Sequence, residues 1–195
     1  MFKRFSICYI LLMFCITGTS AQEDRWTGNA TNLSKGNLRV NSSGRYLEYS
    51  DGTPFLYIGD TAWELISRLN DKETELYLEN RREKGFTVIQ TVILDELDDM
   101  DVSSNGEPKL IDGNIDKPAP GYFTHVDKVI SLAAAKGLYI ALLPTWGDKV
   151  DKQWGKGPEI FTPENAYRYG KWLGERYMNA SNLIWIIGGD RRGDG

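Results

Sequence analysis

Cysteine and histidine are scarce in this sequence, which contains two cysteines and one histidine among 195 residues. Cys8 and Cys15 both lie in the apolar N-terminal segment, so the rest of the chain offers neither disulfides nor thiol chemistry. The single histidine, His125, excludes a site with several histidine ligands and disfavours a Ser-His-Asp triad. We interpret His125 as a structural residue of a helix, and we expect neither a metal site nor a cofactor.

An excess of positive charge is also missing. The net charge is −4 and the isoelectric point is near 5.1, which argues against nucleic acid as a partner. Aromatic residues, in contrast, make up 12% of the chain and include six tryptophans and ten tyrosines. Flat rings can cover the apolar faces of sugars, although ordinary core packing explains most of these residues.

The N-terminus has the pattern of a secretion signal, in which a basic start precedes an apolar run over residues 5–16. The small residues Thr19 and Ala21 predict cleavage before Gln22, so we expect residues 1–21 to be removed and the protein to be secreted or periplasmic. The apolar run is shorter than the roughly 20 residues of a membrane span. We therefore expect no stable membrane insertion after cleavage.

The chain after the signal begins with irregular structure and a hairpin. Residues 22–37 are polar and predict a flexible lead-in. The segments 38–40 and 46–49 flank Asn41–Gly44, a turn sequence typical of a β-hairpin. A further turn leads into residues 55–58, the first expected buried strand.

Strands and helices then alternate. Asn70 and Glu73 form the pattern of a capping box, and they predict a helix to Lys84 that ends at Gly85. The β-branched run that follows, residues 86–94, predicts the second strand.

Two more units repeat this order. Residues 122–136 have apolar positions at helical spacing, and they are followed by Gly137 and a strand over 138–143. Thr162 then predicts a third helix with proline at its first position, and residues 183–187 predict the fourth strand.

Strands separated by helices predict an α/β fold with a parallel sheet and right-handed crossovers. A small doubly wound sheet is one solution, but long charged loops after the strands and tight glycine turns after the helices favour a (β/α)8 barrel. A complete barrel takes about 250 residues. We therefore expect residues 38–195 to be the N-terminal half of such a barrel, about four βα units with the C-terminal half missing.

Four loops at the strand ends carry the candidate chemistry. Each brings at least one carboxylate, and the first and third also bring a tryptophan; the loops are residues 59–64, 94–99, 144–149 and 188–192. The carboxyl ends of parallel strands meet at one edge of a sheet. Glycoside cleavage needs two carboxyl groups, one as an acid and one as a nucleophile or base.

Other roles are possible for these acids. Asp60 and Asp190 could each cap the element that follows them. The acidic run 95–101 fits a solvated loop better than a calcium site, with Glu96, nearest the strand end, as the exception. The pair Asp148–Lys149 fits a surface ion pair that contributes little.

Four segments together resemble a known family, the apiosidase-like glycoside hydrolases. These segments are Gly59–Leu65, Pro144–Lys149, Gly157–Phe161 and Trp185–Asp190. The resemblance implies a retaining TIM-barrel glycosidase secreted by pectin-degrading bacteria. It also implies that Asp190 is the acid/base and that the nucleophile is a glutamate of the second half of the barrel.

Our interpretation is therefore a fragment of a secreted retaining glycoside hydrolase that acts on plant polysaccharide, with apiose-containing pectin favoured. Asp190 is the expected acid/base, and the sugar subsite is expected to be shaped by Asp60, Trp63, Glu96, Trp146 and Asp148. Without the nucleophile we expect the fragment alone to be inactive. The alternatives are a carbohydrate-binding module without turnover, an inert truncated product, and a doubly wound nucleotide-binding domain.

Overall fold

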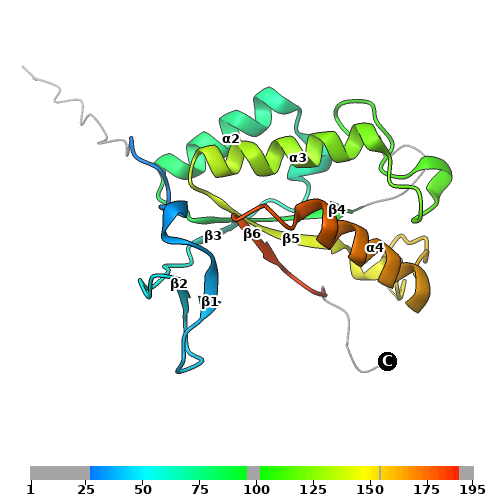
Figure 1. Ribbon diagram of the computed structural model, residues 1–195. Helices are drawn as coiled ribbons and strands as arrows, with labels where there is room; N and C mark the ends of the chain where they lie inside the picture. Colours follow the sequence, from blue (N-terminus) through cyan, green and yellow to red (C-terminus); the bar gives the residue numbers. More distant parts are fainter. Residues whose placement is uncertain (1–26, 96–101, 154, 189–195) are drawn as a thin grey trace, which may run out of the picture.

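A computed structural model describes residues 27–95, 102–153 and 155–188, which form a mixed α/β fold (Figure 1). Within these residues, β1 (Leu38–Val40) and β2 (Leu47–Tyr49) pair as an antiparallel hairpin, as predicted. A four-stranded parallel sheet follows in the order β3-β4-β5-β6, which confirms the predicted parallel sheet. Its strands are β3 (Gly59–Thr61), β4 (Val88–Leu94), β5 (Tyr139–Thr145) and β6 (Leu183–Trp185).

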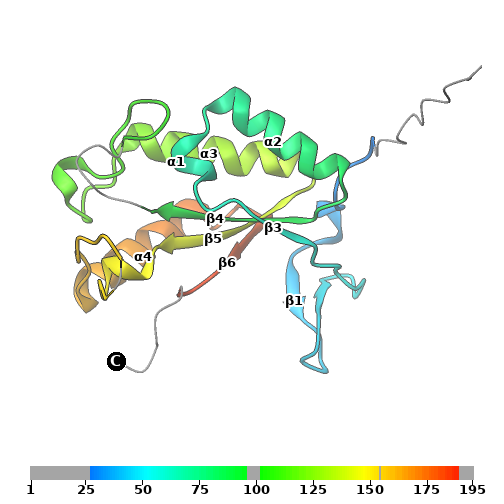
Figure 2. The same ribbon diagram turned by 180° about the vertical axis from the view of Figure 1, so that it is seen from behind.

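Helices separate the strands of this sheet. They are α1 (Leu65–Arg68), α2 (Asp71–Glu83), α3 (Pro120–Ala135) and α4 (Pro163–Tyr177), with short 3-10 turns η1 (Leu33–Lys35), η2 (Ile111–Gly113) and η3 (Gly147–Lys149). The helices α2 and α3 lie side by side over one face of the sheet, and the hairpin lies on the opposite side (Figures 1 and 2). Among the described residues, no helix is long and apolar enough to cross a membrane.

The helix boundaries follow local signals in the sequence. The predicted capping box is present, because the Asn70 side chain accepts the amide of Glu73 while the Glu73 carboxylate accepts the amide of Asn70. Thr162 caps α4, with Pro163 at its first position. Gly85 adopts the predicted left-handed conformation after α2, with φ +81°.

The first buried strand was predicted over residues 55–58, and this is wrong: β3 begins only at Gly59. In residues 55–58 only the Ile58 carbonyl accepts backbone amides near the start of β4, those of Thr87 and Val88 at 2.9 and 3.1 Å. The Phe55 amide donates to the Leu47 carbonyl of the hairpin at 2.8 Å. The Thr87 hydroxyl accepts from the Ile58 amide at 2.8 Å and takes the place of part of a strand ladder.

The predicted flexible lead-in is also corrected over the part of it that the structure describes. The Ala30 amide donates to the Lys136 carbonyl at 2.9 Å, and the Thr31 hydroxyl donates to the Gly137 carbonyl at 2.6 Å. A guanidinium nitrogen of Arg82 donates to the Gly28 carbonyl at 2.6 Å. These bonds fix the segment to the last turn of α2 and to the turn that precedes β5, so it belongs to the folded body.

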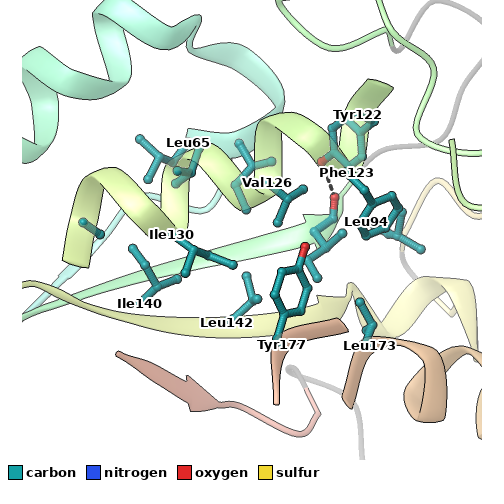
Figure 3. Close-up of a cluster of buried hydrophobic side chains, with 14 of the residues drawn as sticks. Leu65, Leu94, Tyr122, Phe123, Val126, Ile130, Ile140, Leu142, Leu173 and Tyr177 are labelled. Atoms are coloured by element: carbon teal, nitrogen blue, oxygen red, sulfur yellow. Dashed lines mark hydrogen bonds between the residues drawn. The ribbon is translucent and has the colours of Figure 1, made fainter. Parts of the chain in front are cut away.

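The larger core lies between the sheet and the helices. Figure 3 shows side chains of α3 and α4 packed against β4 and β5. Tyr122 is fully buried, and its hydroxyl donates to the Ile93 carbonyl at 2.5 Å. The predicted apolar face of the residue 122–136 helix is buried throughout, at Phe123, Val126, Val129, Ile130 and Ala133.

A smaller core lies between the hairpin and the amino ends of the strands. It joins Tyr49 and Phe55 to Val88, Tyr139 and Ala141 of the sheet. The Phe55 ring packs edge-on against Tyr49 at 5.5 Å and Tyr139 at 5.1 Å between centroids. The hairpin thus covers the amino end of the sheet, while the carboxyl end carries the loops with the candidate residues.

Candidate active site

Two tryptophans meet at the carboxyl end of the sheet. The rings of Trp63, after β3, and Trp146, after β5, lie 5.2 Å apart at 68°. The Trp146 amide donates to the Leu94 carbonyl at 2.9 Å, and the Trp63 carbonyl accepts from the Val92 amide at 3.2 Å. Both loops are therefore fixed to β4, and the predicted convergence of the first and third loops is confirmed.

The Trp63–Trp146 pair is suited to hold an apolar ring face. Both side chains are only partly buried, so they combine packing within the protein with exposed aromatic surface. An edge-to-face aromatic pair contributes about 0.5–1.5 kcal/mol beyond burial, which favours one relative orientation of the two rings. The pair is the clearest candidate for a sugar platform among the described residues.

The carboxylate of Asp60 is directed to α2. It accepts from the Tyr77 hydroxyl at 2.7 Å and pairs with the Arg81 guanidinium at 2.5 Å. Its second oxygen accepts from the Thr61 amide at 2.9 Å. Burial, followed by the hydrogen bond to Asp60, raises the pKa of Tyr77 to about 12, so Tyr77 remains a donor across the physiological range. A contact of Asp60 with substrate stays a prediction.

Asp148 and Lys149 form a buried ion pair, not the surface pair that was considered. The Lys149 ammonium is fully buried and lies 3.0 Å from both Asp148 carboxylate oxygens. The Gly157 amide donates to the same carboxylate at 3.0 Å. Asp148 is thus turned into its own loop, and the predicted role of its carboxylate in a sugar subsite stays a prediction.

Asp95 is likewise buried, at 2% exposure, although a solvated loop was predicted for the run that it begins. Its carboxylate accepts from the Ser67 hydroxyl of α1 and pairs with the buried ammonium of Lys109. The Ser104 amide donates to the Ser67 carbonyl at 2.8 Å. The long loop after β4 is therefore anchored to α1 at the strand end, because a buried charge needs such partners.

Lys109 and Ser67 are polar residues at this edge that the sequence did not reveal. Lys109 stands between Pro108 and Leu110 in a segment without helical or strand periodicity. Its apolar neighbours are the only sign in the sequence that this lysine is buried. Ser67 belongs to α1, a single turn that was not predicted. Both act through contacts between segments that are far apart in the chain.

Two predicted site residues, Glu96 and Asp190, lie outside the described residues. His125 lies in α3, and its position agrees with the structural role that the sequence predicts. The side chain is buried, and its Nδ1 atom lies 3.1 Å from the Asp71 carboxylate of α2. Across the three described stretches, no cluster of potential ligands could hold a metal ion.

The described carboxylates at the carboxyl end of the sheet hold loops and neighbouring side chains in place. Asp60, Asp95 and Asp148 each contact a cationic side chain. Such carboxylates can orient loops and neighbouring side chains. The exposed parts of Trp63 and Trp146 can contact a ligand from the space above the sheet.

Two solved structures that this chain resembles are glycoside hydrolases. One glycoside hydrolase is 40% identical with a TM-score of 0.73, and the match covers 83% of this chain and 36% of that protein. A family 5 glycoside hydrolase from Bacteroides vulgatus ATCC 8482 is 33% identical with a TM-score of 0.74, covering 83% of this chain and 35% of the other. This chain thus spans about a third of the length of these relatives.

More distant structures share the fold alone. The endo-1,4-beta-mannanase from Rhizomucor miehei is 15% identical with a TM-score of 0.53, and the match covers 80% of this chain and 49% of the mannanase. None of the curated proteins matches the sequence significantly. The fold is therefore a parallel α/β arrangement that resembles family 5 TIM-barrel enzymes.

The sequence model of the apiosidase-like catalytic domain matches residues 41–195. The match begins after β1 and includes β2, the four strands of the parallel sheet and the sequences of the four candidate loops. With this match and the two related glycoside hydrolases, the chain belongs to the apiosidase-like family of catalytic domains.

Proposed function

We propose that this chain contributes the first four βα units of a retaining (β/α)8 glycoside hydrolase. The reaction is hydrolysis of a glycosidic bond in a plant polysaccharide, with apiose-containing pectin as the favoured substrate. The observation that carries the proposal is the contact between Trp63 and Trp146 at the carboxyl end of the parallel sheet. Active sites of barrels of this type lie at that end.

Each predicted residue has a distinct role in the proposal. Trp63 and Trp146 hold the apolar face of a sugar ring. Asp60 and Asp148 shape the subsite from behind through their contacts with α2 and with the loop after β5. Glu96 accepts hydrogen bonds from sugar hydroxyls, and Asp190 protonates the departing oxygen.

A retaining mechanism needs a second carboxyl group about 5–5.5 Å from the acid. In our proposal this nucleophile comes from a later strand of the family fold. The 195-residue chain alone should then bind sugar weakly and show no turnover. If the chain binds oligosaccharide but stays inactive when joined to those strands, it acts as a carbohydrate-binding module.

The activity can be tested in a chimera that joins this chain to the remaining strands of the 40% identical glycoside hydrolase. Asp190→Ala in the chimera should reduce turnover strongly on pectic oligosaccharides, whose leaving groups need protonation. Aryl glycosides need little protonation, so kcat/KM on them, which reports formation of the glycosyl-enzyme, should fall much less than on pectic oligosaccharides, although the second step still uses Asp190 as its base. An equal loss of kcat/KM on both substrates would remove Asp190 from the acid role.

Export is a separate part of the proposal. We expect the exported chain to begin at Gln22, because Thr19 and Ala21 match the small-residue cleavage pattern. N-terminal sequencing of protein from the periplasm or medium tests this expectation. A chain that begins at Met1 in the membrane fraction would contradict it.

A further inference from the structure

We propose that Asp148 and Lys149 are a positioning pair that holds the indole of Trp146 against Trp63. The inference rests on the proposed function, in which these two rings are the sugar platform. It assigns to Lys149 a task that the sequence did not suggest, and it defines how Asp148 shapes the subsite.

The first argument is the free energy needed to remove both charges of the pair from water. The Lys149 side chain is 0% exposed and that of Asp148 is 7% exposed, so both charges have left water. Buried ion pairs are often no more stable than apolar side chains of the same size. Stability alone therefore does not explain charges at this place, whereas a requirement for a defined loop geometry does.

The second argument is how the carboxylate organises the loop. Asp148 receives both the Lys149 ammonium and the Gly157 amide, so it joins the start of the loop to a point nine residues later. Gly155 lies directly on the Asp148 side chain: a Cβ atom at this glycine would stand 2.1 Å from the Asp148 Cβ. Glycine is required there because the backbone itself packs on the ion pair.

The third argument is the backbone of Lys149. Its carbonyl accepts from the amides of Ile160 and Phe161 at 2.9 and 3.1 Å, and its amide donates to the Trp146 carbonyl at 3.3 Å. Trp146 is held from the other side by Leu94 of β4. The buried ion pair thus lies at the point where the loop, the tryptophan and the strand are joined.

The test compares variants by circular dichroism, because two indoles in contact give a coupled signal that depends on their relative orientation. The part of the circular dichroism spectrum that disappears in Trp63→Phe is assigned to the Trp63–Trp146 pair. The double variant Asp148→Asn/Lys149→Met removes both charges together, so no single buried charge is left without a partner. We expect this variant to keep its helix signal and to lose most of the tryptophan couplet.

The matched control is the exposed pair Lys171–Glu175 on α4, whose atoms lie 3.8 Å apart. Lys171→Met/Glu175→Gln should leave the couplet unchanged. If the double variant at 148 and 149 folds and keeps its full couplet, the proposal is overturned. If that variant does not fold, Gly155→Ala decides: it keeps both charges but displaces Asp148, and an unchanged couplet would again overturn the proposal.

A titration with pectic oligosaccharide separates this inference from the proposed function. Loss of the couplet in the variants, together with no sugar binding by the unsubstituted chain, would support the positioning pair and contradict the sugar platform. In the active chimera, the double variant should raise KM more than it lowers kcat, because it displaces a binding surface and not a reacting group.

Discussion

The two ends of the parallel sheet are built by different means. At the amino end, glycine turns lead into β4 and β5, and the hairpin packs Tyr49 and Phe55 onto the strand starts. At the carboxyl end, long loops are fixed by the buried charge pairs Asp95–Lys109 and Asp148–Lys149. The amino end combines apolar burial with hydrogen bonds to the backbone, whereas the carboxyl end depends on two buried ion pairs whose desolvation costs free energy.

In (β/α)8 barrels the amino ends of the strands contribute to stability, and the carboxyl ends carry the active site. The difference between the two ends of this sheet agrees with that arrangement. Apolar contacts are non-directional, so they stabilise the packing of the hairpin on the sheet without defining the position of each atom. A buried ion pair is stable only in one geometry, so it defines where a loop lies. The predictions below test this contrast, from the largest expected effect on the free energy of unfolding to the smallest.

Breaking a charge pair at the carboxyl end should have the largest effect. Lys109→Met leaves the Asp95 carboxylate buried without its cation, and we expect a loss of about 3–5 kcal/mol in the free energy of unfolding. Denaturant titration measures the loss. Adding Asp95→Asn should restore most of it, because the charge itself is then gone.

Lys117 in the same loop provides the control, since its pair with Asp112 is solvent-exposed at 3.6 Å. Lys117→Met should change the unfolding free energy by less than about 0.5 kcal/mol. Equal losses for Lys109→Met and Lys117→Met would contradict the contrast between buried and exposed pairs.

The glycine turns of the amino end should differ from each other. Gly137 has φ +71°, and a Cβ atom there would lie 2.5 Å from the Thr31 carbonyl oxygen. Gly85 has φ +81° with open space around it. We expect Gly85→Ala to cost about 1 kcal/mol through its left-handed backbone, and Gly137→Ala to cost at least about 2 kcal/mol because Thr31 must also move.

Thermal and denaturant unfolding of the two alanine variants provide the comparison. Similar losses at both positions would show that the segment around Thr31 is not packed on the turn. That result would restore the flexible lead-in that the sequence predicts.

Trp146→Ala should affect binding far more than stability. The side chain is only partly buried and its ring contacts Trp63, so we expect a loss of about 1–2 kcal/mol in unfolding free energy. Sugar binding, measured by calorimetry on the active chimera, should fall strongly. A stability loss of about 3–5 kcal/mol, typical of buried tryptophan, would make Trp146 a core residue instead.

The smallest effect should come from the tyrosine hydroxyl at the amino end. Burial raises the pKa of Tyr139 to about 12. Above about pH 10 the unfolded chain releases this proton while the folded chain keeps it, so stability is present below pH 10 and is lost as pH rises through 12. Tyr139→Phe should therefore remove about 1 kcal/mol of the stability loss near pH 11. An unchanged alkaline slope in this variant would show that Tyr139 is hydrated.

The sequence by itself determined the elements that depend on local chemistry. The capping residues Asn70 and Thr162 placed the starts of α2 and α4, and apolar runs placed β4 to β6. Local sequence also indicated that Trp63 and Trp146 would share one edge, since strand order in a parallel sheet follows from the alternation of strands and helices. Such signals act within a few residues or follow from topology, so they can be recognised in one dimension.

The tertiary structure alone decided which polar side chains are buried and with whom. Asp95 meets Lys109, and Asp60 meets Tyr77, because folded segments distant in the chain pack together. Asp148 and Lys149 are neighbours in the chain, but they are buried and not a surface pair, and Gly155 and Gly157 of the later loop contact Asp148. Burial of a charge depends on the whole surrounding structure and on the removal of water, and no local pattern of residues encodes it.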